Sequence, residues 1–235
     1  MPRPPRLDTP GLPQHLVVRG HNRSDIFFRD LDRNVFLKYL KHALEKNACS
    51  LHAYVLMTNH VHLLATGTEH GAVSGLMHSV AKRYSRYVNR CRGRSGSLFE
   101  RRFHSSPVQT DTYFLACMRY VESNPVRAGI VPAPWLYRWS SYRINASGNA
   151  RGMLTPHQQY LALGDDDESR ARAYRRLFDA PPDECLVEFR RAASKDEPAG
   201  DQSFKEALQR ELGHPVIRSR PGRPEKTNLV LFPQP

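Results

Sequence analysis

The chain of 235 residues is long enough to bury a full core, and its 40% hydrophobic and 25% charged residues are ordinary for a globular protein. No apolar run approaches the length of a membrane span, and the Pro-rich start is not a signal peptide, so we expect a cytoplasmic protein with no membrane partner. The four cysteines are scattered without a CxxC pair. This predicts buried free thiols and argues against a cysteine-based zinc site, the residues being Cys49, Cys91, Cys117 and Cys185.

The net charge of +12 is unusual, and all of it comes from one part of the chain. Residues 1–150 hold 21 Lys and Arg against 9 Asp and Glu, a surplus of 12, whereas residues 151–235 hold 14 of each. A surplus of this size favours a polyanionic partner, and nucleic acid is the polyanion we expect. Charge alone does not separate DNA from RNA or from an acidic membrane surface.

The predicted elements follow one another in the order of a ferredoxin-like fold. They are strands at 14–20, 51–57, 60–65 and 104–109 and helices at 31–46, 71–92 and around 113–122. Asp30 is the expected N-cap of the first helix, and Asp111 or Thr112 that of the third. This order predicts an α+β fold, in which an antiparallel sheet has helices packed on one face.

The character of the sequence changes after residue 145. We expect a first domain over residues 1–145 and a mainly helical C-terminal extension over residues 146–235, with helices near 168–178 and 203–212. The extension ends in a basic Pro/Arg tail that includes Arg220 and Arg223. The tail resembles an AT-hook, which can enter a DNA minor groove, and a disordered tail is the alternative.

Two histidines lie one residue apart on a predicted strand. Because side chains on a strand alternate between faces, His60 and His62 point the same way, while Val61 and Leu63 point the other way. Two imidazoles so placed can bind one metal ion. The alternative is that they form the polar face of a half-buried strand.

A tyrosine and an asparagine share one face of the third helix. Tyr120 and Asn124 are four residues apart, so a phenol and an amide can converge on one site, and Pro125 predicts that the helix ends or kinks beside Asn124. The amide would be a third metal ligand. The alternative is a core tyrosine and an ordinary helix stop. Tyr113 is the rival nucleophile, but it has no amide four residues later.

Taken together, these groups predict a reaction on a phosphodiester. A divalent ion held by neutral ligands keeps its charge to polarise a phosphate, and a tyrosine hydroxyl can attack phosphorus to form a covalent phosphotyrosine. The adduct retains the bond energy, so neither ATP nor another nucleotide cofactor is needed. Consistently, the sequence contains no GxxxxGK[ST] phosphate loop.

Eight basic residues fall within positions 82–102, opposed by one acid, Glu100. A charge run on a helix is often only a solvated face, but this one is too one-sided for salt-bridge pairing, so we favour contact with the DNA backbone. The residues expected to make it are Lys82, Arg83, Arg86, Arg90, Arg101 and Arg102.

Two stretches carry a resemblance to a known family. They are residues 56–64, LMTNHVHLL, and residues 119–129, RYVESNPVRAG. They resemble the REP-associated tyrosine transposases, a branch of the single-tyrosine HUH transposases. Further agreement lies in residues 19–23, 26–28, 97–103 and 139–142, so the resemblance covers residues 10–145 in order.

The resemblance implies a DNA transposition and recombination enzyme, an HUH endonuclease that cleaves and rejoins single-stranded DNA through a 5′-phosphotyrosine. Carried over residue by residue, it makes Tyr120 the nucleophile and His60, His62 and Asn124 the ligands of Mg²⁺ or Mn²⁺. Relatives act on hairpins of repetitive extragenic palindromes (REPs), so the implied partner is hairpin DNA and the implied place is the nucleoid.

Arg19, Arg23 and Arg127 lie within the matching motifs and are expected to contact DNA. The competing hypothesis is a non-catalytic nucleic-acid-binding regulator on the same fold. RNA-binding sheets of this topology usually carry aromatic residues where this chain has His60 and His62, which favours chemistry. Whether the chain is a monomer or a homodimer stays open.

Overall fold

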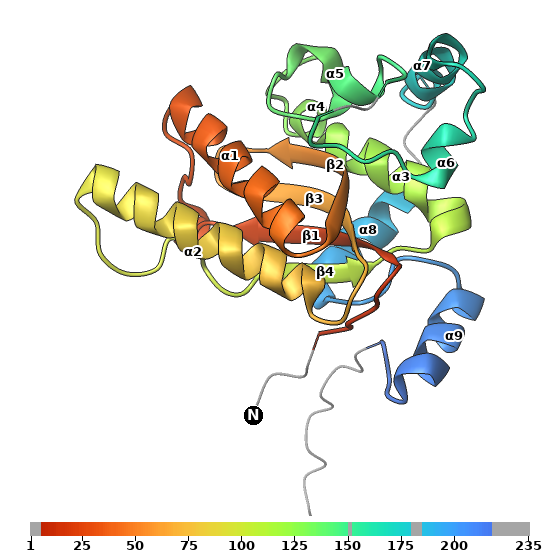
Figure 1. Ribbon diagram of the computed structural model, residues 1–235, viewed down its shortest axis with the longest axis horizontal. Helices are drawn as coiled ribbons and strands as arrows, with labels where there is room; N and C mark the ends of the chain where they lie inside the picture. The colour runs from red at the N-terminus through yellow and green to blue at the C-terminus, as the bar shows by residue number, and fades with distance from the viewer. Residues whose placement is uncertain (1–5, 150–151, 180–184, 218–235) are drawn as a thin grey trace, which may run out of the picture.

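Four strands form one antiparallel sheet (Figure 1) in a computed structural model that describes residues 6–149, 152–179 and 185–217. The strands are β1 (Pro13–Arg19), β2 (Cys49–Leu56), β3 (His60–Gly67) and β4 (His104–Pro107). Their order across the sheet is β2-β3-β1-β4, and Val17 of β1 lies opposite His62 of β3. The predicted histidine strand, β3, is therefore in the interior of the sheet, paired on both sides.

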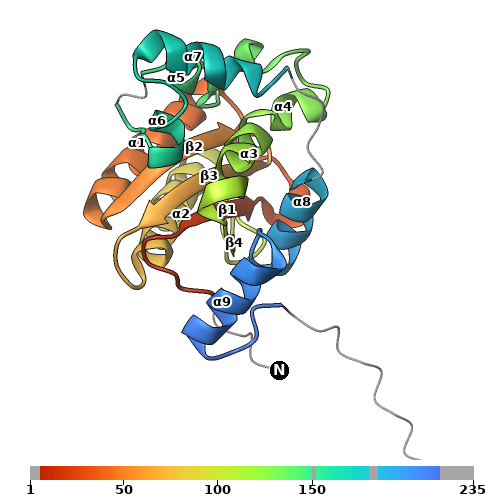
Figure 2. The ribbon, with the colours of Figure 1, turned by 90° about the vertical axis from the view of Figure 1, so that its right-hand side faces the viewer.

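Two crossover helices, α1 (Asp30–Lys46) and α2 (Ala72–Arg92), pack on one face of the sheet (Figure 2). Phe36 and Leu40 of α1 and Tyr84 of α2 are almost fully buried there. The Tyr84 hydroxyl donates a 2.7 Å hydrogen bond to the carbonyl of Ile26. The predicted ferredoxin-like α+β fold is confirmed.

The opposite face of the sheet is covered too, which differs from the expected packing of helices on one face. The helices there are α3 (Thr110–Glu122) and α8 (Cys185–Lys195) (Figure 2), and α8 was not predicted. The remaining elements are η1 (His21–Arg23), α4 (Asn124–Arg127), η2 (Pro134–Leu136), α5 (Tyr142–Asn145), α6 (Gln158–Leu161), α7 (Asp167–Arg176) and α9 (Gln202–Leu212). The two helices expected beyond residue 145 are α7 and α9, whereas α6 and α8 were not predicted. No helix in the described ranges is long and apolar enough to cross a membrane.

The predicted N-cap at Asp30 is wrong. Asp30 is the first residue of α1, and Asp32 supplies the carboxylate that satisfies the free N–H groups at this end. Its Oδ2 accepts from the backbone N–H of Phe28 and of Arg29 at 3.0 Å each. Acids are favoured at the N-cap and throughout the first turn alike, so the sequence does not separate these positions.

The predicted caps of α3 are wrong for the same reason. The helix begins at Thr110, preceded by Gln109, so Asp111 lies in the first turn and Thr112 follows it. Asp111 still faces the positive end of the helix dipole, where a carboxylate is stabilising.

The expectation that all four cysteines are buried is also wrong. All four are free, but only Cys117 is buried, Cys49 and Cys185 are partly buried, and Cys91 is exposed. Cys91 lies in the last turn of α2, where the apolar stripe has already ended at Val88. Periodicity predicts which face a residue is on, but not where the neighbouring element stops covering that face.

The hydrophobic core continues from the sheet into the residues beyond 145. Phe114 of α3, Tyr160 of α6, Tyr174 of α7 and Phe189 of α8 are buried in one cluster with the sheet residues. The division into domains over residues 1–145 and 146–235 stays a prediction. In the described residues, the hydrophobic core extends across residue 145.

Glu122, at the end of α3, joins the two parts through its fully buried carboxylate. Its Oε1 accepts hydrogen bonds from Ser141 Oγ at 2.5 Å and from Asn145 Nδ2 at 2.8 Å. Its Oε2 accepts from the Tyr174 hydroxyl at 2.7 Å. The end of α3 is therefore tied by polar contacts to α5 and to α7.

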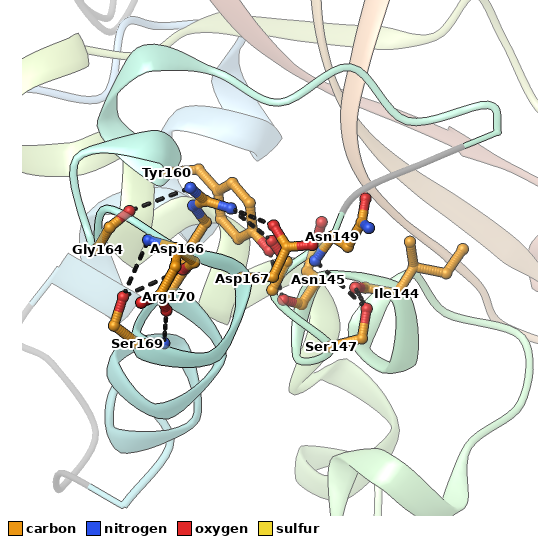
Figure 3. A network of polar contacts seen from close by, with 11 residues as sticks. Ile144, Asn145, Ser147, Asn149, Tyr160, Gly164, Asp166, Asp167, Ser169 and Arg170 are labelled. Atoms are coloured by element: carbon orange, nitrogen blue, oxygen red, sulfur yellow. Dashed lines mark hydrogen bonds and ion pairs between the residues drawn. The ribbon is translucent and has the colours of Figure 1, made fainter.

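A close polar network holds the turn after α5 against α7 (Figure 3). Arg170 donates to the carbonyl of Gly148 at 2.8 Å and to Asp167 Oδ1 at 2.9 Å, and the Tyr160 hydroxyl donates to the carbonyl of Asn145 at 2.6 Å. Gly148 has a φ of +81°, and a Cβ there would lie 1.6 Å from the carbonyl oxygen of Asp167. The turn therefore requires glycine for its backbone angle and for its close approach.

The extension also returns to the edge strand of the sheet. Asp196 Oδ1 lies 2.8 Å from His104 Nδ1, and Ala199 forms a parallel backbone bridge with Val108. These contacts come from residues that directly follow α8 in the chain, and they lie at the edge of β4 that no other strand of the described residues pairs with.

Candidate active site

The two histidines of β3 lie on the face of the sheet that α3 covers. Their ring centroids are 5.0 Å apart and their planes are at 75°. His60 is half-buried at the first position of β3, and His62 is 6% exposed. The predicted shared face of His60 and His62 is confirmed by this geometry.

Each ring has a hydrogen-bond partner at Nδ1. His60 Nδ1 lies 2.6 Å from Asn59 Oδ1, and the Asn59 amide is oriented by a 2.8 Å bond from its Nδ2 to the carbonyl of Arg23. His62 Nδ1 lies 2.8 Å from Nε2 of His15 on β1. Partners of this kind fix the ring orientation of metal-ligating histidines.

Burial keeps both rings neutral. Burial and, after it, the positive charge of Arg19 lower the pKa of His60 to about 4. The pKa of His62 lies well below its usual value, first because of burial and then because of His15, His60, Arg127 and Arg19. Neutral imidazoles are the form that binds metal ions.

Tyr120 of α3 reaches the same place. It is 4% exposed, and its ring centroid is 6.0 Å from that of His62 and 5.4 Å from that of Phe189 on α8. The guanidinium carbon of Arg127 lies 4.6 Å from the ring centroid, a cation–π contact. Tyr113 lies beside Phe189, with 6.1 Å between ring centroids, and does not line the cavity described next.

Tyr120 and His62 open into one cavity of about 230 Å³. Four arginines and one glutamate contribute to its wall, which suits an anion such as a phosphodiester. The polar lining residues are Arg19, Glu100, Arg101, Arg102, His104, Arg190 and Ser194.

Asn124 is the first residue of α4, directly after Ser123, which separates α4 from α3. Its Nδ2 donates to the carbonyls of Tyr120 at 2.8 Å and of Val121 at 3.2 Å, which leaves the amide oxygen Oδ1 to accept a hydrogen bond or to bind a metal ion. The predicted helix break before Pro125 is confirmed, since α3 ends at Glu122. Neither Asn124 nor His60 is among the residues that line the cavity.

The other predicted DNA contacts fall in two places. Arg23 is exposed in η1 close to Asn59. The basic residues of α2 are exposed on the far side of the sheet from Tyr120, where three of them border a hollow of about 320 Å³ with Tyr39 and Tyr87. They are Lys82, Arg83, Arg86 and Arg90, of which Lys82 does not border the hollow. Arg220 and Arg223 lie outside the described residues.

Sequence reasoning missed several residues of this site, among them His15, Phe189, Arg190 and Ser194. His15 had a readable signal, since it alternates with Val17 and Arg19 on a predicted strand and so shares their face. Phe189, Arg190 and Ser194 had none, because their role depends on where α8 docks. No spacing in the sequence reports that docking.

Three neutral atoms of the predicted ligands are left to bind a metal ion. Nδ1 of His60 and of His62 is occupied, which leaves Nε2 of each ring to face a metal, and Oδ1 of Asn124 is the available amide oxygen. All three are neutral donors that Mg²⁺ or Mn²⁺ accepts. Within the described ranges, no group of three or more His, Cys, Asp or Glu side chains is placed to hold a metal ion.

Comparisons with known proteins identify the family that the chain resembles. Residues 9–124 match the family model described as Transposase IS200 like. A solved structure described as the REP associates tyrosine transposase bound to a REP hairpin matches with a TM-score of 0.55 and 14% identity, over 67% of this chain and 93% of that one. A candidate transposase from Deinococcus radiodurans R1 matches with 18% identity over 50% of this chain and 93% of that one, at a TM-score of 0.37. No curated protein matches. The family resemblance predicted from the motifs is confirmed.

Proposed function

The chain belongs to the IS200-like transposases, and from this premise we propose that it cleaves and rejoins single-stranded hairpin DNA through a covalent bond to Tyr120. The observation that carries the proposal is the cavity, where a tyrosine and a neutral histidine meet under four arginines. Each group has a task at a phosphodiester: the arginines bind it, the histidine holds a metal ion beside it, and the tyrosine attacks it.

In the cleavage step the Tyr120 oxygen forms a bond to phosphorus, and the bond from phosphorus to the 3′ oxygen breaks. The phenolic proton is lost to solvent, and the departing 3′ oxygen takes up a proton. The products are a 5′-phosphotyrosine and a free 3′-hydroxyl. Attack of a 3′-hydroxyl on the phosphotyrosine reverses the step and rejoins a strand, with no nucleotide cofactor.

Arg127 is suited to hold the phosphate during this exchange. Its guanidinium lies over the Tyr120 ring, and its Nη1 is buried without a hydrogen-bond partner among the described residues. A buried donor with no partner is costly, so it favours a ligand oxygen that accepts from it. A phosphate joined to Tyr120 would supply that oxygen.

His60, His62 and Asn124 would hold Mg²⁺ or Mn²⁺. When bound, the ion supplies charge that polarises the phosphodiester. The residues themselves keep the donors neutral and oriented, because burial holds both imidazoles uncharged and Asn59 and His15 fix their rings.

The basic face of α2 would bind a second stretch of the same DNA. Lys82, Arg83, Arg86 and Arg90 lie across the sheet from Tyr120, so the strand being cleaved does not reach them directly. The paired stem of a hairpin extends far enough to follow such a surface, and phosphate contacts would position it without reading its sequence. The solved relative described as bound to a REP hairpin supports a hairpin substrate. Arg220 and Arg223 stay proposed contacts of the tail.

The test is a search for the covalent adduct. The protein is incubated with Mn²⁺ or Mg²⁺ and a hairpin oligonucleotide labelled at one end, and the products are separated under denaturing conditions. The adduct should carry the DNA on the 3′ side of the cut, so it should keep a label placed at the 3′ end, and it should map to Tyr120. It should disappear in Tyr120→Phe and His60→Ala, while Tyr113→Phe, the matched control, should retain it.

A stable complex with the hairpin but no adduct in either metal would contradict the proposal. In that case the chain acts as a nucleic-acid-binding regulator on a transposase fold. An adduct that maps to Tyr113 would keep the chemistry but overturn the assignment of the nucleophile.

A further inference from the structure

His15 is a buried histidine that no motif singles out. It lies on β1, two positions before Val17, the residue paired with His62, and on the same face. The rings of His15 and His62 are nearly parallel, with 8° between their planes and 5.1 Å between their centroids, as expected for two imidazoles joined edge to edge by a hydrogen bond. The ring centroid of His15 lies 5.5 Å from that of Tyr120, in an edge-on contact. Its exposure is 0%.

The contact between the two imidazoles constrains where their protons lie. His15 Nε2 and His62 Nδ1 are 2.8 Å apart, so exactly one proton lies between them when both rings are neutral. If His62 Nδ1 donates, His62 Nε2 keeps a lone pair and can bind a metal ion. If His15 Nε2 donates, the proton of His62 is on Nε2 and ligation is blocked.

The other histidine has no such freedom. Asn59 Oδ1 can only accept, and the bond from Asn59 Nδ2 to Arg23 fixes which end of the amide faces His60. His60 is therefore held with its proton on Nδ1. His62 instead depends on a partner that can either donate or accept, so the state of His15 decides whether the second ligand is available.

We propose that His15 is a positioning residue for the metal site. Nε2 of His15 accepts a hydrogen bond from Nδ1–H of His62, and this contact orients the His62 ring so that Nε2 of His62 faces the ion. The inference rests on the proposed metal-dependent function. It also explains why a polar ring is buried beside Tyr120 with its Nδ1 lacking a hydrogen-bond partner among the described residues. The energetic cost of this unpaired buried nitrogen arises at the position where His62 needs a hydrogen-bond acceptor.

Two variants separate the acceptor from the ring. His15→Phe keeps an aromatic ring and removes the acceptor, whereas His15→Gln keeps a side-chain oxygen that can accept from His62. Mn²⁺ affinity is measured by electron paramagnetic resonance on the full chain with a hairpin oligonucleotide present. We expect about 10- to 100-fold weaker binding in His15→Phe and partial recovery in His15→Gln.

His52→Phe is the matched control. His52 is another buried histidine of the sheet, hydrogen-bonded to Thr66 and to the carbonyl of Thr155 and not in contact with His62. Its loss should leave the Mn²⁺ affinity unchanged. Circular dichroism of every variant checks that the fold is retained.

A second measurement needs no variant. Nitrogen-15 NMR of the unaltered chain with Mg²⁺ and the oligonucleotide reports the tautomer of each ring, and we expect His62 with its proton on Nδ1. A proton on Nε2 of His62, or equal Mn²⁺ affinity in His15→Phe and the unaltered chain, would overturn the role of His15 alone. No Mn²⁺ binding by the unaltered chain would overturn the metal site itself and this inference with it.

Discussion

Replacing Glu122 by glutamine is expected to change how the stability of the fold depends on pH. Burial raises the pKa of Glu122 to about 7, although the hydrogen bonds from Ser141, Tyr174 and Asn145 act to lower it. In the unfolded chain the pKa of this carboxyl group is near the ordinary 4.5. Between the two values the folded state binds more protons than the unfolded state, so stability falls as pH rises.

The size of the effect follows from the two pKa values. Their separation, from 4.5 to about 7, corresponds to about 3 kcal/mol of unfolding free energy, present below the lower value and lost as pH passes the higher one. About 2 kcal/mol of this is lost between about pH 5.5 and about pH 8.5. Glutamine has the size of the protonated acid and cannot ionise, so the Glu122→Gln variant should lack this loss.

The assay is urea unfolding of the unaltered chain and of Glu122→Gln at both pH values. For each protein, the change in unfolding free energy between the two pH values is taken. The difference between the changes of the two proteins contains only the contribution of Glu122, because all other titrating groups are common to both. Glu45→Gln, at an exposed position of α1, is the control and should follow the unaltered chain. Parallel changes in the unaltered chain and in Glu122→Gln would refute the reasoning, because they would mean that the buried carboxyl group does not titrate in this range.

Four further outcomes are expected. Gly148→Ala should destabilise the fold by about 2 to 4 kcal/mol in thermal melts, since it combines a positive φ with a clash. Gly152→Ala, with a φ of +79° and open space around it, should lose only about 1 kcal/mol, and equal losses would contradict the clash. Burial lowers the pKa of His52 to about 4, so below about 6.5 the unfolded chain binds a proton that the folded His52 does not. His52 alone should therefore cost the fold about 2 kcal/mol between about pH 7 and about pH 5, and His52→Gln should lose less stability than the unaltered chain. Arg127→Gln should lower adduct formation about 10- to 100-fold with an unchanged melting temperature, and an unchanged yield would remove Arg127 from the phosphate site. Mn²⁺ should bind about tenfold or more tightly when the oligonucleotide is present, as titration calorimetry can test, because its phosphate offsets the positive charges beside His62.

The sheet and its two crossover helices could be predicted because their signal is periodic and local. Alternation along β3 places His60 and His62 on one face without knowledge of any neighbour. The break beside Asn124 follows from Pro125 alone. The meeting of Tyr120 with His62 across the fold came from the family resemblance, since no local pattern reports a contact between residues so far apart.

The rest depends on which surfaces meet, and a single sequence does not encode that in a readable pattern. His15 could be assigned to a face, but its contact with His62 requires the order in which β1 and β3 lie side by side. Arg190 enters the cavity only because α8 docks beside α3. The predicted N-caps at Asp30 and Asp111 were wrong because an acidic side chain stabilises the start of a helix about equally at neighbouring positions of the first turn.

Because residues after α8 contact the edge of β4, the fold around the sheet is completed late in synthesis. A ribosome that has released only the first 145 residues has released all four strands and Tyr120, but neither Phe189 nor Arg190. At that stage the tyrosine ring lacks its cover from α8, and the edge of β4 still lacks the bridge to Ala199. An exposed strand edge invites pairing with other chains. Release of residues 185–199 from the ribosome therefore completes the cavity wall and covers part of the edge of β4.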